Sequence, residues 1–129
     1  MRISMTSVMV DDQEKALRFY TEKLGFEKKV DMPVSEEHRW LTVVSTDAPD
    51  GTQLLLEPNG MEASQVFQAA MYEAGVPLMA FQVDDCAAEH ERLAAAGVSF
   101  KTEPKDMGAA VIAVFDDTCG NYIQIYQEK

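Results

Sequence analysis

The segment Val8-Met9-Val10-Asp11-Asp12 returns later in the chain, in altered form, as Phe81-Gln82-Val83-Asp84-Asp85. In both places a helical pattern follows and ends at a glycine, first in Leu24-Gly25-Phe26 and then in Ala96-Gly97-Val98. A unit of this length that occurs twice is typical of a duplicated supersecondary module, whereas a solenoid would need at least three copies.

The second halves of the two units also correspond. The run Asp50-Gly51-Thr52-Gln53-Leu54-Leu55-Leu56 resembles Cys119-Gly120-Asn121-Tyr122-Ile123-Gln124-Ile125, and the offset drifts only from 73 to 69 residues along the unit. We therefore divide the chain into module one at residues 1–60, a connecting helix at 61–75 and module two at 76–129, which together form a single domain.

Composition excludes several classes of protein. The 129 residues are 47% hydrophobic and 26% charged, which is typical of a folded globular chain. The net charge of −11 disfavours nucleic acids and anionic membranes as partners. The two cysteines do not make a disulfide framework, and neither a signal peptide nor a membrane span is recognisable, so we expect a cytoplasmic protein.

Both modules predict the element order βαβββ. In module one we expect strands at 4–10, 26–30, 39–45 and 53–57 and a helix at 13–24. Asp11 is the expected cap of that helix, with Glu14 completing a capping box. Gly25 is placed to end it. The segments 31–37 and 46–51 are predicted loops, because they contain Pro33 and Pro49.

In module two we expect strands at 78–83, 98–102, 109–115 and 122–127 and a helix at 86–96. Asp85 is its predicted cap and Gly97 its predicted end. Between the modules, an apolar stripe marks a further helix at 61–74, which we expect to pack on the core; the alternatives are a pocket lid or a subunit interface. The stripe consists of Val66, Phe67, Ala70, Met71 and Ala74.

The pattern resembles the vicinal oxygen chelate superfamily, which includes glyoxalase I, bleomycin and fosfomycin resistance proteins, methylmalonyl-CoA epimerase and extradiol dioxygenases. The resemblance extends from about Arg2 to Glu128 and is carried above all by Phe19-Tyr20 with Leu24-Gly25-Phe26, and by the duplication. It implies an α+β fold in which two tandem βαβββ modules form a curled, open-barrel mixed sheet around one cavity. It also implies a homodimer.

Metal-dependent members of this superfamily hold a divalent cation with His and carboxylate side chains on the first and last strand of each module. The resemblance places those positions at Met5, Leu55, Leu78 and Gln124. A thioether, two alkyl groups and an amide do not form such a site, so we expect no metal and no other cofactor. A register slip of two residues would bring in Ser7, Ala80, Glu57 and Tyr126 instead, with Glu57 as the one anionic ligand.

Other chemistry is weakly supported. We interpret His38 as a surface residue and His90 as a half-buried helix residue, and neither lies at a metal position of the superfamily. Cys86 lies at a helix start, where the dipole lowers a thiol pKa, but two adjacent carboxylates oppose that effect. No catalytic residue can be named, and whether the chain is an enzyme stays open.

The sequence therefore favours a glyoxalase/bleomycin resistance-like protein that binds a small organic molecule in the cavity between its modules. The alternatives are a lyase, epimerase or dioxygenase with a displaced site at Glu57, Gln124 and Tyr126, and a regulatory domain that binds a partner through the apolar stripe. The candidate cavity residues are Met5, Ser7, Trp40, Thr42, Leu55, Glu57, Leu78, Gln82, Gln124 and Tyr126.

Overall fold

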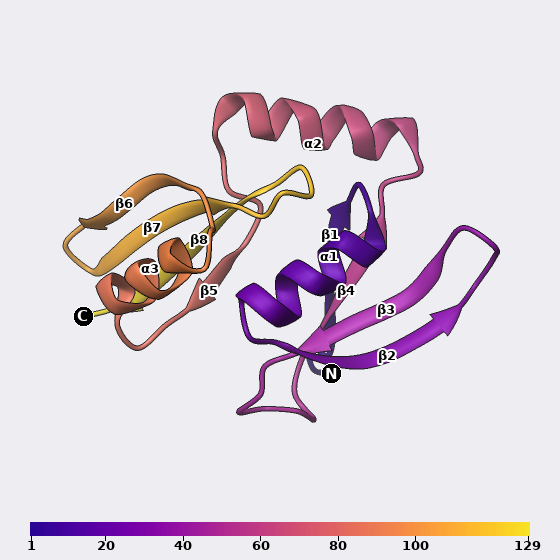
Figure 1. The fold of residues 1–129 in the computed structure, drawn as a ribbon, viewed down its shortest axis with the longest axis horizontal. Helices are drawn as coiled ribbons and strands as arrows, with labels where there is room; N and C mark the ends of the chain where they lie inside the picture. The colour runs from indigo at the N-terminus through magenta and orange to yellow at the C-terminus, as the bar shows by residue number, and fades with distance from the viewer. The chain divides into compact units, whose positions relative to one another are not determined.

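The computed structural model describes all residues from 1 to 129 and has two compact units, Met1–Val66 and Phe67–Lys129. The first contains β1 (Met5–Val10), α1 (Gln13–Arg18), a π-helical turn (Phe19–Lys23), β2 (Glu27–Pro33), β3 (Arg39–Val44) and β4 (Gln53–Pro58). The second contains β5 (Ala80–Gln82), α3 (Cys86–Ala95), β6 (Phe100–Asp106), β7 (Ala110–Asp116) and β8 (Tyr122–Glu128). Helix α2 (Glu62–Ala74) connects them (Figure 1).

Each unit contains one four-stranded mixed sheet, with the orders β1-β4-β3-β2 and β5-β8-β7-β6. In both, the first strand runs parallel to the last and the other neighbours are antiparallel. The predicted βαβββ order is therefore present twice, in a mixed α+β fold. No helix is long and apolar enough to span a membrane.

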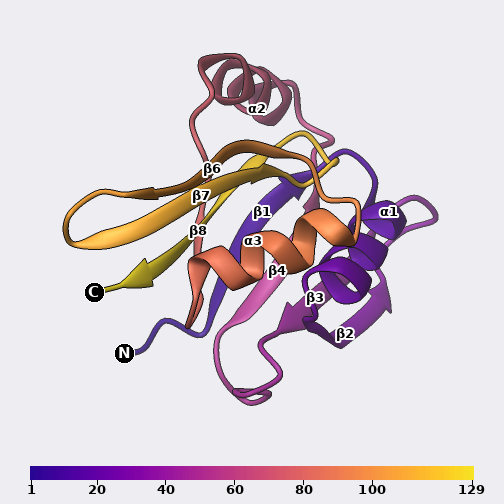
Figure 2. The ribbon, with the colours of Figure 1, turned by 60° about the vertical axis from the view of Figure 1, so that its left-hand side comes forward.

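The core of each unit lies between its helix and one face of its sheet (Figures 1 and 2). In the first unit α1 packs on β3 and β4, and strand alternation turns Val8, Val10, Leu41, Leu54 and Leu56 into that layer with Tyr20. In the second unit α3 packs on β6, β7 and β8 over Phe115, Ile123 and Leu93. Neither α1 nor α3 covers the opposite face of its own sheet.

Helix boundaries follow local signals, with one correction. Asp12, and not Asp11, caps α1: its carboxylate accepts a hydrogen bond from the Lys15 amide at 2.9 Å, while Asp11 pairs with the Lys15 ammonium. Asp85 caps α3 in the predicted way, accepting from the Ala88 amide at 2.9 Å. Gly25 and Gly97 follow their helices at φ +85° and +91°, a conformation that disfavours other residues.

The edge strands β2 and β6 extend further than predicted. β2 continues to Pro33 and β6 continues through Pro104 to Asp106, although we ended these strands at Val30 and Thr102. Both are edge strands, where a missing amide donor costs no ladder hydrogen bond. β5, in contrast, is limited to three residues, shorter than the predicted 78–83.

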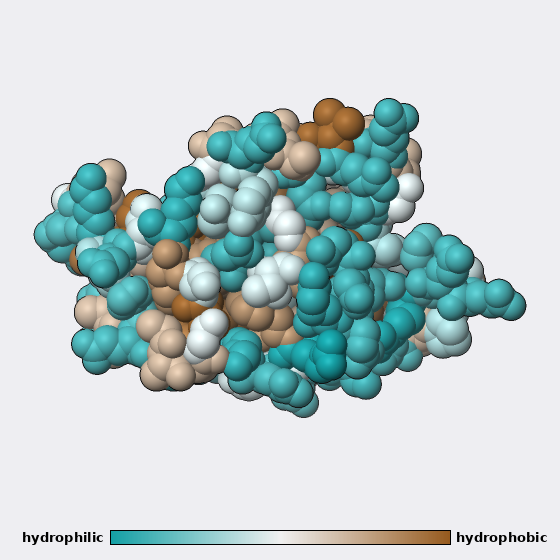
Figure 3. Space-filling model, turned by 45° about the horizontal axis from the view of Figure 1, so that its top comes forward, coloured by the Kyte–Doolittle hydropathy of each residue, from teal (hydrophilic) through white to brown (hydrophobic).

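The expectation that the apolar stripe of α2 packs on the core is wrong. Val66 and Phe67 are 63% and 55% exposed, and the buried residue of the helix is polar Gln68, at 5%. Figure 3 shows hydrophobic atoms, in brown, at the surface over α2. The Gln68 side-chain amide donates to the Cys119 carbonyl at 3.1 Å and to the Asn121 side-chain oxygen at 3.0 Å, so polar contacts hold the middle of the helix.

A second contact of α2 is aromatic. The rings of Tyr72 and Tyr122 stack with centroids 4.4 Å apart, and the Lys101 ammonium lies 4.7 Å from the Tyr122 ring centroid. The Tyr72 hydroxyl donates to the Asp116 carboxylate at 2.5 Å. That contact raises the pKa of Tyr72 above its usual range, because ionising the phenol would place two negative charges together.

Candidate functional site

The face of the first sheet that α1 does not cover is lined by the candidate residues of module one. Ser7 on β1 pairs with Leu55 on β4, and Leu55 pairs with Thr42 on β3. Two residues further along β1 and β4, Met9 pairs with Glu57. Since side chains two residues apart share a face, Met5 and Trp40 belong to the same surface. This surface, which we call the sheet-A face, is thus apolar apart from a few polar groups.

Exposure varies along the sheet-A face. Thr42 and Leu55 are buried, Glu57 is half-buried, and Met5 and Trp40 are 37% and 39% exposed. The Thr42 hydroxyl donates to the Gln53 side-chain oxygen at 2.7 Å and accepts from the Val30 amide at 3.2 Å. The Thr42 hydroxyl is therefore hydrogen-bonded within the sheet. The side chains of the face that remain exposed to a ligand are the apolar Met5 and Trp40.

The second unit repeats this register. Ala80 pairs with Gln124, which pairs with Val114, and Gln82 pairs with Tyr126. These pairs correspond to those of Ser7 with Leu55 and of Met9 with Glu57 at the repeat offsets of 73 and 69 residues. Leu78 precedes β5, and its amide donates to the Tyr122 carbonyl at 3.0 Å.

The donor groups on these faces do not fit a divalent metal. The first unit offers one carboxylate, Glu57, among thioether and alkyl groups, and the second offers two amides and a phenol at Gln82, Gln124 and Tyr126. A catalytic cation needs about three protein ligands, chiefly imidazole or carboxylate. Nowhere in the chain do three or more His, Cys, Asp or Glu side chains gather as a metal would require.

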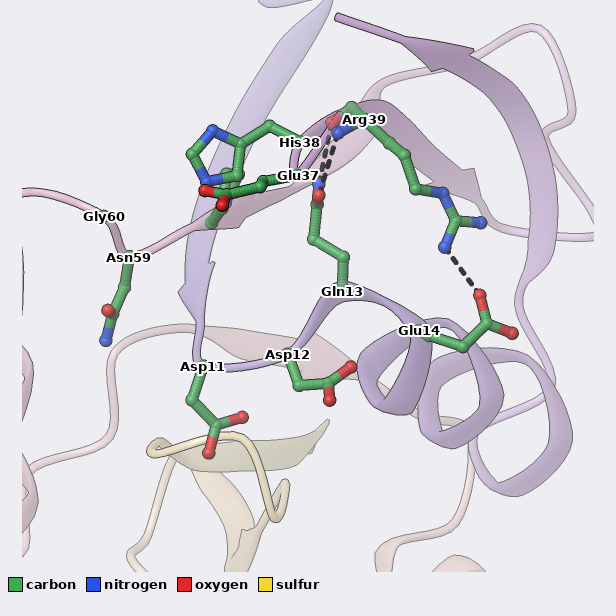
Figure 4. A pocket seen from close by; sticks show the side chains of 10 residues that line it. Asp11, Asp12, Gln13, Glu14, Glu37, His38, Arg39, Asn59 and Gly60 are labelled. Carbon is green, nitrogen blue, oxygen red and sulfur yellow. Dashed lines mark hydrogen bonds and ion pairs between the residues drawn. The ribbon is translucent and has the colours of Figure 1, made fainter. Parts of the chain in front are cut away.

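A separate pocket of about 420 Å³ lies in the first unit where β1 and β4 end and α1 begins (Figure 4). Gln13 forms part of it. Its Nε2 donates to the carbonyls of Arg39 at 2.7 Å and Leu56 at 2.8 Å, and its Oε1 accepts from the Arg39 amide at 2.9 Å. This side chain stands between β3 and β4 beyond the Thr42–Leu55 pair, where the regular pairing of the two strands ends. The lining residues are Asp11, Asp12, Gln13, Glu14, Glu37, His38, Arg39, Pro58, Asn59 and Gly60.

The cation of this pocket, Arg39, is paired with one carboxylate of the lining, Glu14, and with Asp31 outside the lining. The Arg39 guanidinium binds the Glu14 carboxylate at 2.5 Å and both carboxylate oxygens of Asp31, at 2.8 and 3.0 Å. These hydrogen bonds lower the pKa of Asp31 to about 2 and raise the pKa of Arg39, since each favours the charged form of its partner.

Sequence reasoning missed both the pocket and Gln13. The repeat held a usable signal, because Gln13 and Cys86 are equivalent at an offset of 73 and both are buried at the first position of their helices. For Cys86, burial and the nearby Asp85 carboxylate raise the pKa of the thiol, which disfavours a nucleophilic thiolate. His38 is exposed, and His90 is half-buried against the Phe100 ring, with centroids 4.4 Å apart; both match expectation.

Known proteins resemble the chain along its whole length. YurT of Bacillus subtilis (strain 168) is 53% identical over 99% of this chain and 100% of its own, and YetH of the same organism is 33% identical over 93% and 92%. Among solved structures, UcmS2 is 35% identical over 98% of this chain and 97% of its own, with a TM-score of 0.84. TnmS3, an antibiotic binding protein from Streptomyces sp. CB03234, is 29% identical over 100% and 97%, with a TM-score of 0.76.

The model of one family matches residues 2–125, which covers nearly all of module one and most of module two. The resemblance inferred from the repeat and from the Phe19–Phe26 segment is thereby confirmed. The chain belongs to the Glyoxalase/Bleomycin resistance protein/Dioxygenase superfamily.

Proposed function

We propose that this protein binds a small organic molecule on the sheet faces that α1 and α3 leave uncovered. The observation that carries the proposal is the sheet-A face, where Met5 and Trp40 remain more than a third exposed beside the buried Leu55. Flexible thioethers and an indole next to a few polar groups are a common lining for organic ligands. In the second unit, Gln82, Gln124 and Tyr126 supply amide and hydroxyl groups at equivalent positions.

We propose further that binding needs no metal. The ligand positions implied by the superfamily are occupied by Met5, Leu55, Leu78 and Gln124, and shifting the register adds only one carboxylate, Glu57. The likeness to TnmS3, whose description is that of an antibiotic binding protein, favours sequestration of a ligand over its conversion.

The test is a ligand screen that reads the fluorescence of Trp40, the one tryptophan of the chain. We expect saturable quenching by at least one organic compound, an unchanged ligand after incubation, and weaker binding in Leu55→Phe, which would crowd the centre of the face without adding a second tryptophan. Ala69→Ser, on the exposed surface of α2, is the control. A broad library that quenches nowhere would overturn the proposal.

The alternative is an enzyme of the same superfamily with a displaced site at Glu57, Gln124 and Tyr126. The half-buried carboxylate of Glu57 favours this alternative, because a carboxylate can act as a base or as a metal ligand. Separate incubation with Ni²⁺, Zn²⁺, Mn²⁺ and Fe²⁺, desalting and mass spectrometry would decide. One metal per chain that is lost in both Glu57→Ala and Gln124→Ala would establish the displaced site and refute the metal-free proposal.

We also propose that the protein is a homodimer, to which the exposed stripe of α2 contributes. Val66 and Phe67 leave apolar surface uncovered in the single chain. The same stripe would serve a regulatory domain that binds another protein. Light scattering after gel filtration should give twice the chain mass of 14.3 kDa, and Phe67→Ser should shift the protein toward the monomer. A wild-type monomer at micromolar concentration would contradict the homodimer.

A further inference from the structure

Glu57 is the carboxylate of the sheet-A face, and it has no partner. It makes no hydrogen bond or ion pair in the structure, although it is half-buried. Its neighbour across β1 is Met9. On β3, Thr42 pairs with Leu55 of β4, where the register between these strands ends; Trp40 lies two residues beyond Thr42 and therefore on the same sheet face as Glu57. A half-buried carboxylate thus shares one sheet face with a neighbouring thioether and an indole.

Four basic side chains of the same unit are paired with other carboxylates. Lys28 pairs with Asp31, Lys29 with Asp50, and Arg39 with Asp31 and Glu14. Lys15 pairs with Asp11. None of these cations neutralises Glu57. A partly buried charge without a counterion is unfavourable, and a cation delivered by a ligand would remove that cost.

Trp40 indicates that such a ligand contains an aromatic ring. An aromatic ring can lie against the indole, and a cation near its face gains an attraction to the ring quadrupole. The sulfur atoms of Met5 and Met9 are polarisable and adapt to a flat ring. The chain's net charge of −11 also attracts cations over a longer range and repels anions.

Building on the proposed ligand-binding function, we propose that the ligand class of the sheet-A face is an aromatic compound with a positive charge. The aromatic ring lies against Trp40 and the cationic group pairs with the Glu57 carboxylate. The two groups act together: Trp40 selects for the ring and Glu57 selects for the sign of the charge.

Three probes with one ring system test this directly: N-methylacridinium, neutral acridine at pH 8, and acridine-9-carboxylate. Affinities are measured by calorimetry, with Trp40 quenching as the second readout. We expect the cation to bind at least tenfold more tightly than acridine, and the carboxylate to bind most weakly. Glu57→Gln should bring cation and neutral probe within about threefold of each other, with the affinity for acridine unchanged.

The control variant is Glu27→Gln, which removes the same charge from an exposed position on the edge strand β2. It should keep the tenfold preference, because its effect is limited to the net charge. Equal loss of preference in both variants would assign the selectivity to the overall charge and overturn the role of Glu57. Three probes that quench Trp40 with equal affinity would overturn the charge selectivity and leave ligand binding intact, whereas a ligand-binding failure across the whole library concerns the proposed function itself.

Discussion

Gln13 binds the backbone of Arg39 through both ends of its side-chain amide, donating to the carbonyl at 2.7 Å and accepting from the N–H at 2.9 Å. A side chain thereby supplies hydrogen bonds at the end of a strand ladder. It is 8% exposed and its partners are partly buried, so removing it would leave unpaired polar groups away from water.

We expect Gln13→Ala to lower the free energy of unfolding by about 2–3 kcal/mol, since three hydrogen bonds are lost. Urea denaturation followed by circular dichroism measures it. Gln65→Ala removes one exposed hydrogen bond to Asn59 and should cost less than about 0.5 kcal/mol. Equal costs for the two variants would show that Gln13 is not a structural bridge.

Acid should weaken the first unit through Asp31. Its pKa is lowered to about 2 by Arg39, so the ionised pair contributes stability above the ordinary aspartate pKa of 3.8, and this contribution is lost as the pH falls toward 2. Because both side chains are partly exposed, we expect about 0.5–1 kcal/mol.

The measurement for this pair is the urea midpoint of wild type and Asp31→Asn at pH 6 and pH 2.5. The variant should be less stable at pH 6, and the difference should shrink at pH 2.5. Asp47→Asn, at an exposed loop position without an ion pair, serves as the comparison. A wild-type advantage of the same size at both pH values would rule out the linkage.

The Tyr72 phenol should ionise at a higher pH than an ordinary tyrosine. The hydrogen bond to Asp116 raises its pKa, so ultraviolet absorbance at 295 nm should show a phenol of the wild type that ionises above the usual tyrosine range. Asp116→Asn removes the negative charge and should move that phenol back toward pH 10, the usual value. An unchanged titration curve in Asp116→Asn would contradict the contact.

Alanine substitutions at Gly97 and Gly120 would measure the steric cost of a Cβ beside Gln68, because only Gly120 lies against that side chain. Gly97 has φ +91° and open space where a Cβ would lie, so Gly97→Ala should cost only the backbone strain, about 1 kcal/mol. Gly120 has φ +99°, but a Cβ there would lie 2.8 Å from the buried Gln68 amide nitrogen. Gly120→Ala should therefore cost about 2–4 kcal/mol, and equal values from thermal or urea unfolding would mean that Gln68 yields freely.

Features encoded locally could be predicted from the sequence. The two βαβββ units, the cap at Asp85 and the terminal glycines Gly25 and Gly97 all depend on residues within one turn or on the repeat itself. The extension of β2 to Pro33 and of β6 past Pro104 could not be predicted, because a proline ends a central strand but is tolerated at an edge, and only the sheet order tells which strands are edges.

Long-range partners explain the remaining differences. An apolar stripe on α2 gives the periodicity of a helix but does not say what covers it, and the structure instead buries Gln68. Gln13 reads as an ordinary polar residue at a helix start, yet it reaches Leu56, 43 residues away. For the sheet-A face, the alternation along β1, β3 and β4 could predict which residues share a face, whereas the exposure of Met5 and Trp40 depends on packing.

The parallel pairing of β1 with β4 also constrains how a module is built. The hairpins β2–β3 and β3–β4 close short loops between neighbours, whereas Val8 must find Leu56 across most of the module. Long loop closures are slow, so we expect the three-stranded meander to form first and β1 to dock last, in both copies. Val8→Ala should then accelerate unfolding and leave the refolding rate nearly unchanged, which stopped-flow kinetics would reveal. Duplicating such a module duplicates its order of assembly along with its shape.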